Sequence, residues 1–259
     1  EIVSNETNGL DVDKFDYILR DCYYCGVKSS FDPMRLMKLS RLIDGHICFH
    51  KKAQFDIIEL FYTRFHLYRK AYLHKTTVAI ELMLADIFFH ADDVYGFKNI
   101  MNNRDIDKFL TLNESLIGSI KLSKNPKLKN SQEIIKKLDN RDLYKMAAEE
   151  SITTKLNIER NSISTEKLLE YSPNIKKDQI FIIAGELGPN EKASEAIKKT
   201  KFFNSENPFN TFELETNSFL NGKDKMTLRC FVTNSDLVDE AKNGFHKFCK
   251  ERNWIKLNL

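Results

Sequence analysis

From Phe55 to Ala91 the chain reads FDIIELFYTRFHLYRKAYLHKTTVAIELMLADIFFHA, with neither glycine nor proline in the run. Its apolar residues recur at intervals of three and four, the period of one face of an α-helix. We therefore expect a long, buried central helix here. The same spacing extends from Asp11 to about Glu150, so the first part of the chain is predicted to be an all-helical block.

The rest of this block divides into shorter helices. The sequence predicts four of them, at residues 11–25, 32–43, 131–138 and 141–150. The first ends at Gly26, a typical C-terminal cap, and the second begins with Asp32-Pro33, a cap followed by proline at the first helical position. Ser131 is the expected N-cap of the third helix.

The composition changes after residue 150. A polar stretch at 151–173 predicts a loop or short hairpin. Short β-branched and aromatic runs at 179–184, 211–215 and 226–233 predict strands, and a final helix is expected at 236–252 with Ser235 as its cap. The fold class is therefore mostly α, α+β overall, with a helical part over residues 1–150 and a small α+β lobe over residues 151–259.

The composition excludes several classes of protein. The 259 residues are 42% hydrophobic and 30% charged, which does not fit a disordered chain. No apolar run approaches the roughly 20 residues of a membrane helix, so no membrane partner is expected. The 40 basic and 37 acidic side chains leave a net charge of +3, too small for a general polyanion binder unless the basic groups are concentrated locally.

The start of the chain and its cysteines bear on its context. It opens Glu1-Ile2-Val3-Ser4, without an initiator Met or a signal sequence, so we expect a segment of a longer protein. Five cysteines are an odd number and indicate a reducing compartment, the nucleus or the cytoplasm. Cys22 and Cys25 have C-x-x-C spacing without a second pair, which favours ordinary helical thiols over a zinc or redox site.

A first candidate site lies on the helix expected at residues 11–25. At 100° per residue, Asp13, Tyr17 and Asp21 form one column with Arg20 beside them. The opposite, core-facing side is expected to consist of Phe15, Ile18, Leu19 and Cys22. A carboxylate can bind a metal ion or accept from a sugar hydroxyl, and a phenol can donate. The alternative is an amphipathic helix whose acids lie near its positive N-terminal end.

A second candidate site lies within the central run. On a continuous helix Arg64, Tyr68, Tyr72 and Lys75 fall within about a quarter-turn. Arginine binds phosphate in a bidentate manner and an aromatic ring can stack on a base. No acidic residue occurs from Thr63 through Ile80, whereas an ordinary solvated face would include acids as partners of the bases. The pattern favours anion or nucleotide binding over an exposed basic surface.

Four stretches together resemble one known family. They are NGLDVDKFDY continuing to Arg20-Asp21-Cys22, Phe61-x-Thr63-Arg64 running into RKAYLHK at residues 69–75, NPKLK at residues 125–129, and Arg141-x-Leu143-x-Lys145. This pattern is similar to the eukaryotic sterile-alpha-motif and HD-domain deoxynucleoside triphosphate triphosphohydrolases. The resemblance implies hydrolysis of a dNTP to a deoxynucleoside and triphosphate. It also implies that residues 1–150 are the C-terminal portion of a helical HD-type catalytic domain, followed by a lobe for oligomerisation and regulation.

The resemblance implies roles for individual residues. Asp13 would be the last ligand of a divalent metal (Zn, Fe, Mn or Mg). The substrate contacts would be Lys14, Tyr17 and Arg64 to phosphates, Asp21 to the sugar hydroxyl, Tyr72 to the sugar and base edge, and Leu73 in place of a base-contacting Gln. The family's other metal ligands, a His and a His-Asp pair, are absent, because no His-Asp dipeptide occurs in the sequence. We therefore expect the segment to be inactive alone.

The resemblance also implies two activator sites for Mg-bound nucleotides, which drive assembly into homodimers and homotetramers. Arg141 and Lys145 match the GTP site. The residues that match or replace those of the dNTP activator site are Arg35, His50, Lys52, Asp56, Lys70 and His74. His50 replaces an Arg and Asp56 an Asn, and a carboxylate near a triphosphate is repulsive. The second site is therefore expected to be weakened or altered.

Two other classes of function remain open at this point. One is a catalytically dead module that binds nucleotides or single-stranded nucleic acid through Arg64–Lys75. The acids Asp13, Asp16 and Asp21 argue against it, because they would repel a phosphate backbone. The other class is a purely structural oligomerisation domain.

Overall fold

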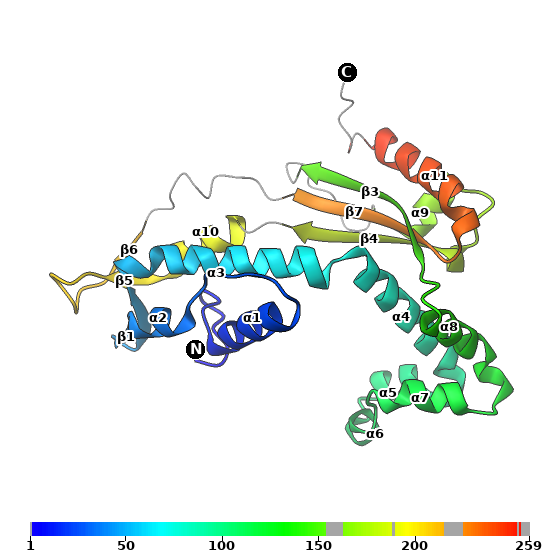
Figure 1. Ribbon diagram of the computed structural model, residues 1–259, viewed down its shortest axis with the longest axis horizontal. Helices are drawn as coiled ribbons and strands as arrows, with labels where there is room; N and C mark the ends of the chain where they lie inside the picture. The colour runs from blue at the N-terminus through cyan, green and yellow to red at the C-terminus, as the bar shows by residue number, and fades with distance from the viewer. Residues whose placement is uncertain (1, 154–162, 188–189, 215–224, 253, 255–259) are drawn as a thin grey trace.

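The structure of the chain, a computed structural model, describes residues 2–153, 163–187, 190–214, 225–252 and 254 (Figure 1). Helices dominate, and two small sheets accompany them, so the mostly α, α+β class is confirmed. Among the described residues, no helix is long and apolar enough to cross a membrane.

The expected central helix is present but is not continuous. It consists of α3 (Gln54–Leu67) and α4 (Lys75–Tyr95), joined by the π-helical turn η2 (Tyr68–Tyr72). His74 then acts as the N-cap of α4, its ring accepting from the backbone of Thr76 at 3.3 Å. Side chains satisfy backbone carbonyls that the break leaves free: Arg229 donates to the carbonyl of Leu73, and Thr77 to that of Ala71 at 2.8 Å.

The first predicted helix is confirmed as α1 (Val12–Tyr24), which lies beside α3 in Figure 1. Asp11 caps it by accepting from the backbone of Lys14 at 2.9 Å, and the chain leaves it through Gly26 at φ +64°. Phe15, Ile18 and Cys22 are buried in one core with the apolar face of α3. The expectation that Leu19 also faces the core was wrong, because its side chain is exposed at the edge of the apolar face. This core fixes α1 against α3.

The second predicted helix is correct only in its first half. Asp32 caps α2 (Pro33–Lys38), but β1 (Ser40–Ile43) follows and pairs with β2 (His46–His50). The Asp44-Gly45 turn has φ of 49° and 76°, and two positive values identify the type I′ turn that favours hairpins. The helical expectation for residues 40–43 was therefore wrong because hairpin pairing replaces the helix there.

The helices after α4 form an arm that extends away from α1 and α3 (Figure 1). They are α5 (Phe97–Asn102), α6 (Ile106–Leu110), α7 (Ser115–Leu122), η3 (Pro126–Leu128) and α8 (Lys129–Asp139). The expectation that Ser131 caps a helix was wrong: it is fully buried inside α8, and its hydroxyl donates to the carbonyl of Ile87 at 2.8 Å. Asn125 is the cap, and it serves η3.

The helix predicted at residues 141–150 is instead β3 (Lys145–Thr153). β3 joins β7 (Lys225–Val232) and β4 (Ile180–Leu187) in an antiparallel sheet of order β3-β7-β4. A register shift between Met146 and Ala148 hides the alternating pattern of a strand, and pairing with β7 overrides the helix propensity of the Ala-Ala-Glu-Glu run.

The predicted C-terminal elements are mostly present. β4 and β7 match the strands expected at 179–184 and 226–233, and the last helix is α11 (Val238–Glu251). Ser235 does not cap it: Ser235 opens the 3-10 turn η7 (Ser235–Leu237), whose N-cap is Asn234. The strand expected at 211–215 is β6 (Phe212–Glu213), and residue 215 lies outside the described residues. The stretch expected as a loop holds α9 (Thr165–Leu169), and residues 154–162 also lie outside them.

Two elements that the sequence did not suggest return the chain to its first part. α10 (Asn190–Lys199) packs on α3, and β5 (Lys201–Phe203) pairs in parallel with β2. The resulting sheet has the order β1-β2-β5-β6. The division expected at residue 150 therefore falls within β3, and residues 190–213 lie against the helical part (Figure 1).

A glycine allows close packing between α11 and the segment that follows α9. A Cβ added at Gly244 would lie 2.7 Å from the carbonyl oxygen of Tyr171. We expect Gly244→Ala to lower the free energy of unfolding by about 1–3 kcal/mol in chemical denaturation, the usual cost of overpacking. Gly118→Ala is the matched control, because that helical position has open space, and it should raise stability by about 0.5–1 kcal/mol. Equal effects of the two changes would contradict the packing described.

Candidate functional site

A network of phenols centred on Arg64 connects α1 to η2. The Arg64 Nε donates to the Tyr17 hydroxyl at 3.1 Å, and Nη2 donates to the Tyr68 hydroxyl at 3.0 Å. The guanidinium carbon also lies 4.3 Å from the centre of the Tyr68 ring. Tyr17 and Arg64, predicted on two separate helices, are thus brought together, and Tyr68 joins them.

A second pair extends this network toward Asp21. The Tyr72 hydroxyl donates to the Asp21 carboxylate, and the Tyr72 ring packs edge-on against Tyr68 with centroids 5.0 Å apart. Burial, followed by the neighbouring Asp21, raises the pKa of Tyr72 above its usual value. Burial also raises the pKa of Tyr17, although Arg64 opposes that shift. Both phenols therefore stay protonated at neutral pH and remain hydrogen-bond donors.

Lys14 lies beside this network, and Leu73 packs elsewhere. The Lys14 ammonium is 3.8 Å from the Asp11 carboxylate, and burial lowers its pKa while Asp11 opposes the change. The Leu73 side chain faces Gly185 of β4, where an added Cβ would lie 3.8 Å from Leu73 Cδ1. The position expected to contact a base thus packs toward the three-stranded sheet.

The described residues do not fit a metal site by themselves. Asp13 is exposed on the first turn of α1, and no group of three or more His, Cys, Asp or Glu side chains gathers around an ion-sized space in the part of the chain that the structure describes. One carboxylate defines neither the geometry nor the affinity of a metal centre. Cys22 is buried and Cys25 exposed, and both are free thiols.

Two lysines that the sequence did not single out complete a cavity next to Arg64. The cavity has a volume of about 270 Å³, and Lys192 and Lys199 of α10 line it together with Lys14 and Arg64. The sequence analysis predicted no element at residues 190–199 and gave these lysines no role. No local signal could show that α10 packs on α3.

The residues expected at the dNTP activator site form two groups. Near the N-terminal end of α3, the Arg35 Nε donates to Asp56 at 3.0 Å, and the His50 ring accepts from the backbone of Lys52 at 3.1 Å. Burial, followed by Lys52 and Arg41, lowers the pKa of His50.

The second group lies beyond the other end of α3. Lys70 belongs to η2 and His74 caps α4. At 1.5 Å per residue, Asp56 and Lys70 are separated by about 20 Å along the axis. One subunit alone therefore does not gather this set around one nucleotide.

The two residues expected at the GTP site do converge. Arg141 and Lys145 line a cavity of about 350 Å³ together with Lys75 and Thr76, at the N-terminal end of α4. Lys75 was expected to share a face with Arg64, and this was wrong because the helix breaks at Leu73. Three basic side chains and a helix N-terminus favour an anionic ligand here.

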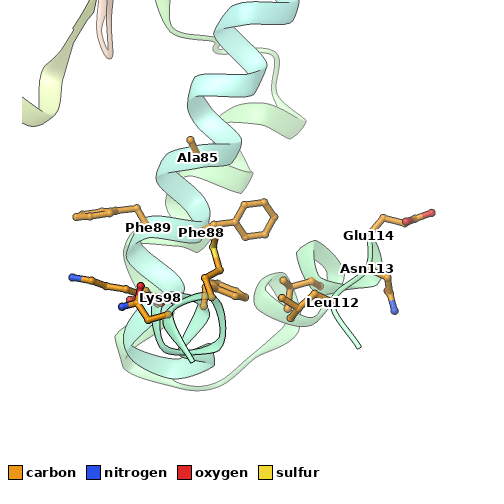
Figure 2. Close-up of a pocket in the computed structure, with 12 residues that line it drawn as sticks. Ala85, Phe88, Phe89, Lys98, Leu112, Asn113 and Glu114 are labelled. Atoms are coloured by element: carbon orange, nitrogen blue, oxygen red, sulfur yellow. Dashed lines mark hydrogen bonds between the residues drawn. The ribbon is translucent and has the colours of Figure 1, made fainter. Parts of the chain in front are cut away.

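A further cavity lies in the arm, away from all of these residues. It has a volume of about 710 Å³, and aromatic and aliphatic side chains dominate its lining, among them Phe88, Phe89, Phe97 and Leu112 (Figure 2). Lys98 and Glu114 are among the polar residues that also line it. It contains none of the residues proposed from the sequence.

Several curated proteins are similar to the chain. A deoxynucleoside triphosphate triphosphohydrolase SAMHD1 homolog of Dictyostelium discoideum is 33% identical over 98% of this chain and 50% of its own length. The human deoxynucleoside triphosphate triphosphohydrolase SAMHD1 is 28% identical over 99% of this chain and 45% of its own length. A putative HD domain-containing protein of Acanthamoeba polyphaga mimivirus is 30% identical over 95% and 58%. No family model matches.

The chain spans about half the length of the curated relatives it matches. These relatives are dNTP triphosphohydrolases and a putative HD domain-containing protein, and the similarity extends over nearly the whole of this chain.

Proposed function

We propose that the chain is a segment of a metal-dependent dNTP triphosphohydrolase, which converts a dNTP and water to a deoxynucleoside and triphosphate. The observation that carries this proposal is the network of Arg64 with Tyr17 and Tyr68, next to the Tyr72–Asp21 pair. A cation, protonated phenols and a carboxylate acceptor lie side by side, as recognition of a phosphorylated sugar requires.

Each of these side chains contacts a different part of the dNTP. Arg64 and Lys14 bind phosphate oxygens, and Tyr17 holds the guanidinium in place while contacting a phosphate. Asp21 accepts from the sugar hydroxyl. The raised pKa of Tyr72 keeps its hydroxyl protonated, so it orients Asp21 by donating a hydrogen bond to it. The Tyr72 ring packs against the sugar and base edge.

Asp13 supplies one ligand of the divalent metal ion. The described residues do not complete such a site, so the remaining ligands are proposed to come from elsewhere in the full-length protein. The chain alone is then a substrate-contacting part of an active site rather than a complete catalyst.

Nucleotide activators are proposed at two further places. GTP binds in the cavity of Lys75, Arg141 and Lys145. A dNTP activator bridges two copies of the chain. The Arg35 group and the Lys70–His74 group lie at opposite ends of α3, so one nucleotide can contact both groups only if they come from different subunits. The functional unit is then a homodimer or homotetramer, and nucleotide stabilises it.

Replacing the proposed metal ligand tests the catalytic assignment. In the full-length protein, Asp13→Ala should lower triphosphate release from a dNTP by more than about 100-fold, since even the loss of groups that only support metal ligands costs 10–100-fold. Nucleotide-induced assembly, measured by light scattering, should persist. Asp16→Ala is the matched control on the same helix, because Asp16 pairs only with exposed Arg20 in the described contacts. Undiminished release by Asp13→Ala would refute the assignment.

The Arg35–Asp56 ion pair predicts the behaviour of the second activator site. Asp56→Asn removes a repulsive carboxylate and leaves Arg35 available to phosphate, so the dNTP concentration that gives half-maximal assembly should fall by about tenfold at fixed GTP. Glu59→Gln removes the same charge one turn along α3, where Ser30 is the described partner, and should have little effect. An unchanged or weaker response to dNTP in Asp56→Asn, or assembly that needs no nucleotide, would contradict the proposal.

A further inference from the structure

The cavity between the N-terminal loop, α3 and α10 carries more positive charge than the proposed function uses. Four basic side chains line it, Lys14, Arg64, Lys192 and Lys199, against the two acids Glu6 and Glu195. Glu195 and Lys199 pair with each other, because the Glu195 carboxylate lies 2.5 Å from the Lys199 ammonium. The lining still presents a net positive charge to a ligand, since the basic side chains outnumber the acids.

α10 is fixed in place beside Arg64. Ala193, Ala196 and Ile197 are buried in the same core as Phe61 of α3. The Asn8 side chain also donates to the hydroxyl of buried Thr200 at 3.1 Å, which ties the N-terminal loop to the end of α10. Because packing holds the helix backbone, binding of a ligand orders only the lysine side chains and not the helix that carries them.

The loop itself does not form a phosphate cradle of backbone amides. The backbone amides of Thr7 and Asn8 both donate to the Asn5 side chain, at 3.1 and 3.4 Å, and the amide of Leu10 donates to the Asn8 side chain at 3.0 Å. Recognition in this cavity must therefore come from the charged side chains rather than from a nest of amides.

The size of the cavity limits the ligand. Its volume of about 270 Å³ is below the roughly 300–1,000 Å³ of pockets that enclose drug-sized molecules. It suits a short chain of phosphates better than a whole nucleotide. Arg64 belongs both to this cavity and to the phenol network, so a ligand can extend from one to the other.

We propose that Lys192 and Lys199 of α10 form, with Lys14 and Arg64, a polyphosphate subsite for the terminal phosphates of the substrate and for the inorganic triphosphate that leaves. This inference rests on the proposed function. It makes α10 a phosphate-binding element of the site and assigns binding roles to two lysines that the sequence did not indicate.

Titration of the chain with inorganic triphosphate, followed by calorimetry, tests the subsite. Lys192→Ala should weaken binding by about tenfold, the effect of losing one hydrogen bond to a charged group. Lys198→Ala is the matched control on the same helix, since Lys198 is exposed and does not line the cavity, and it should bind like the unmodified chain. Lys192→Arg keeps the positive charge but changes the shape of the side chain, so it should retain most of the affinity for triphosphate. If Lys192 only supported the local packing, this variant would lose affinity as well.

Several results would overturn the subsite. They are equal losses in Lys192→Ala and Lys198→Ala, an unchanged affinity in Lys192→Ala, or no binding of triphosphate by the unmodified chain at millimolar concentration. Arg64→Ala separates the two proposals: loss of binding there but not in Lys192→Ala leaves the proposed function intact and removes the subsite. Conversely, Lys192-dependent binding in a full-length protein that does not hydrolyse dNTPs retains the subsite and removes the proposed function.

Discussion

The hydrogen bond from Arg229 of β7 to the carbonyl of Leu73 holds the break between α3 and α4. Arg229 also pairs with Glu149 of β3 at 2.5 Å, so the three-stranded sheet is tied to the point at which the central helix changes direction. On one side of the break, Tyr68 and Tyr72 pack against each other beside Arg64 and Asp21. On the other side, Lys75 lies with Arg141 and Lys145. A continuous helix would place Lys75 on the face of Arg64 instead.

This separation gives a chain with a net charge of only +3 more than one place at which basic side chains gather. Basic side chains gather at the cavity beside Arg64 and at the cavity beside Arg141, while acids such as Asp11 and Asp56 pair with individual bases. Local concentration of charge, rather than the total, determines where phosphate can bind.

The sequence predicted the parts of the fold that depend on local signals. Asp11 and Gly26 mark the two ends of α1, and the helix expected near the C-terminus is present as α11. Two predictions were wrong for different reasons. Ser40–Ile43 forms a strand because the Asp44-Gly45 turn makes a local hairpin with β2, and Lys145–Thr153 forms a strand because it pairs with β7, which is far away in the sequence. For the candidate site, helical spacing placed Tyr17 and Arg64 each on one face, but only tertiary packing shows that they touch and that Lys192 lies nearby.

We propose that this chain contributes substrate contacts but not a complete metal centre. The most direct measurement combines binding of dGTP to the chain, by calorimetry, with detection of released inorganic triphosphate in the presence of Mg²⁺, Mn²⁺, Fe²⁺ or Zn²⁺. We expect the chain to bind dGTP with an affinity that Arg64→Ala weakens, and to release no triphosphate with any of the four ions. Metal-dependent release of triphosphate by the chain alone would contradict it.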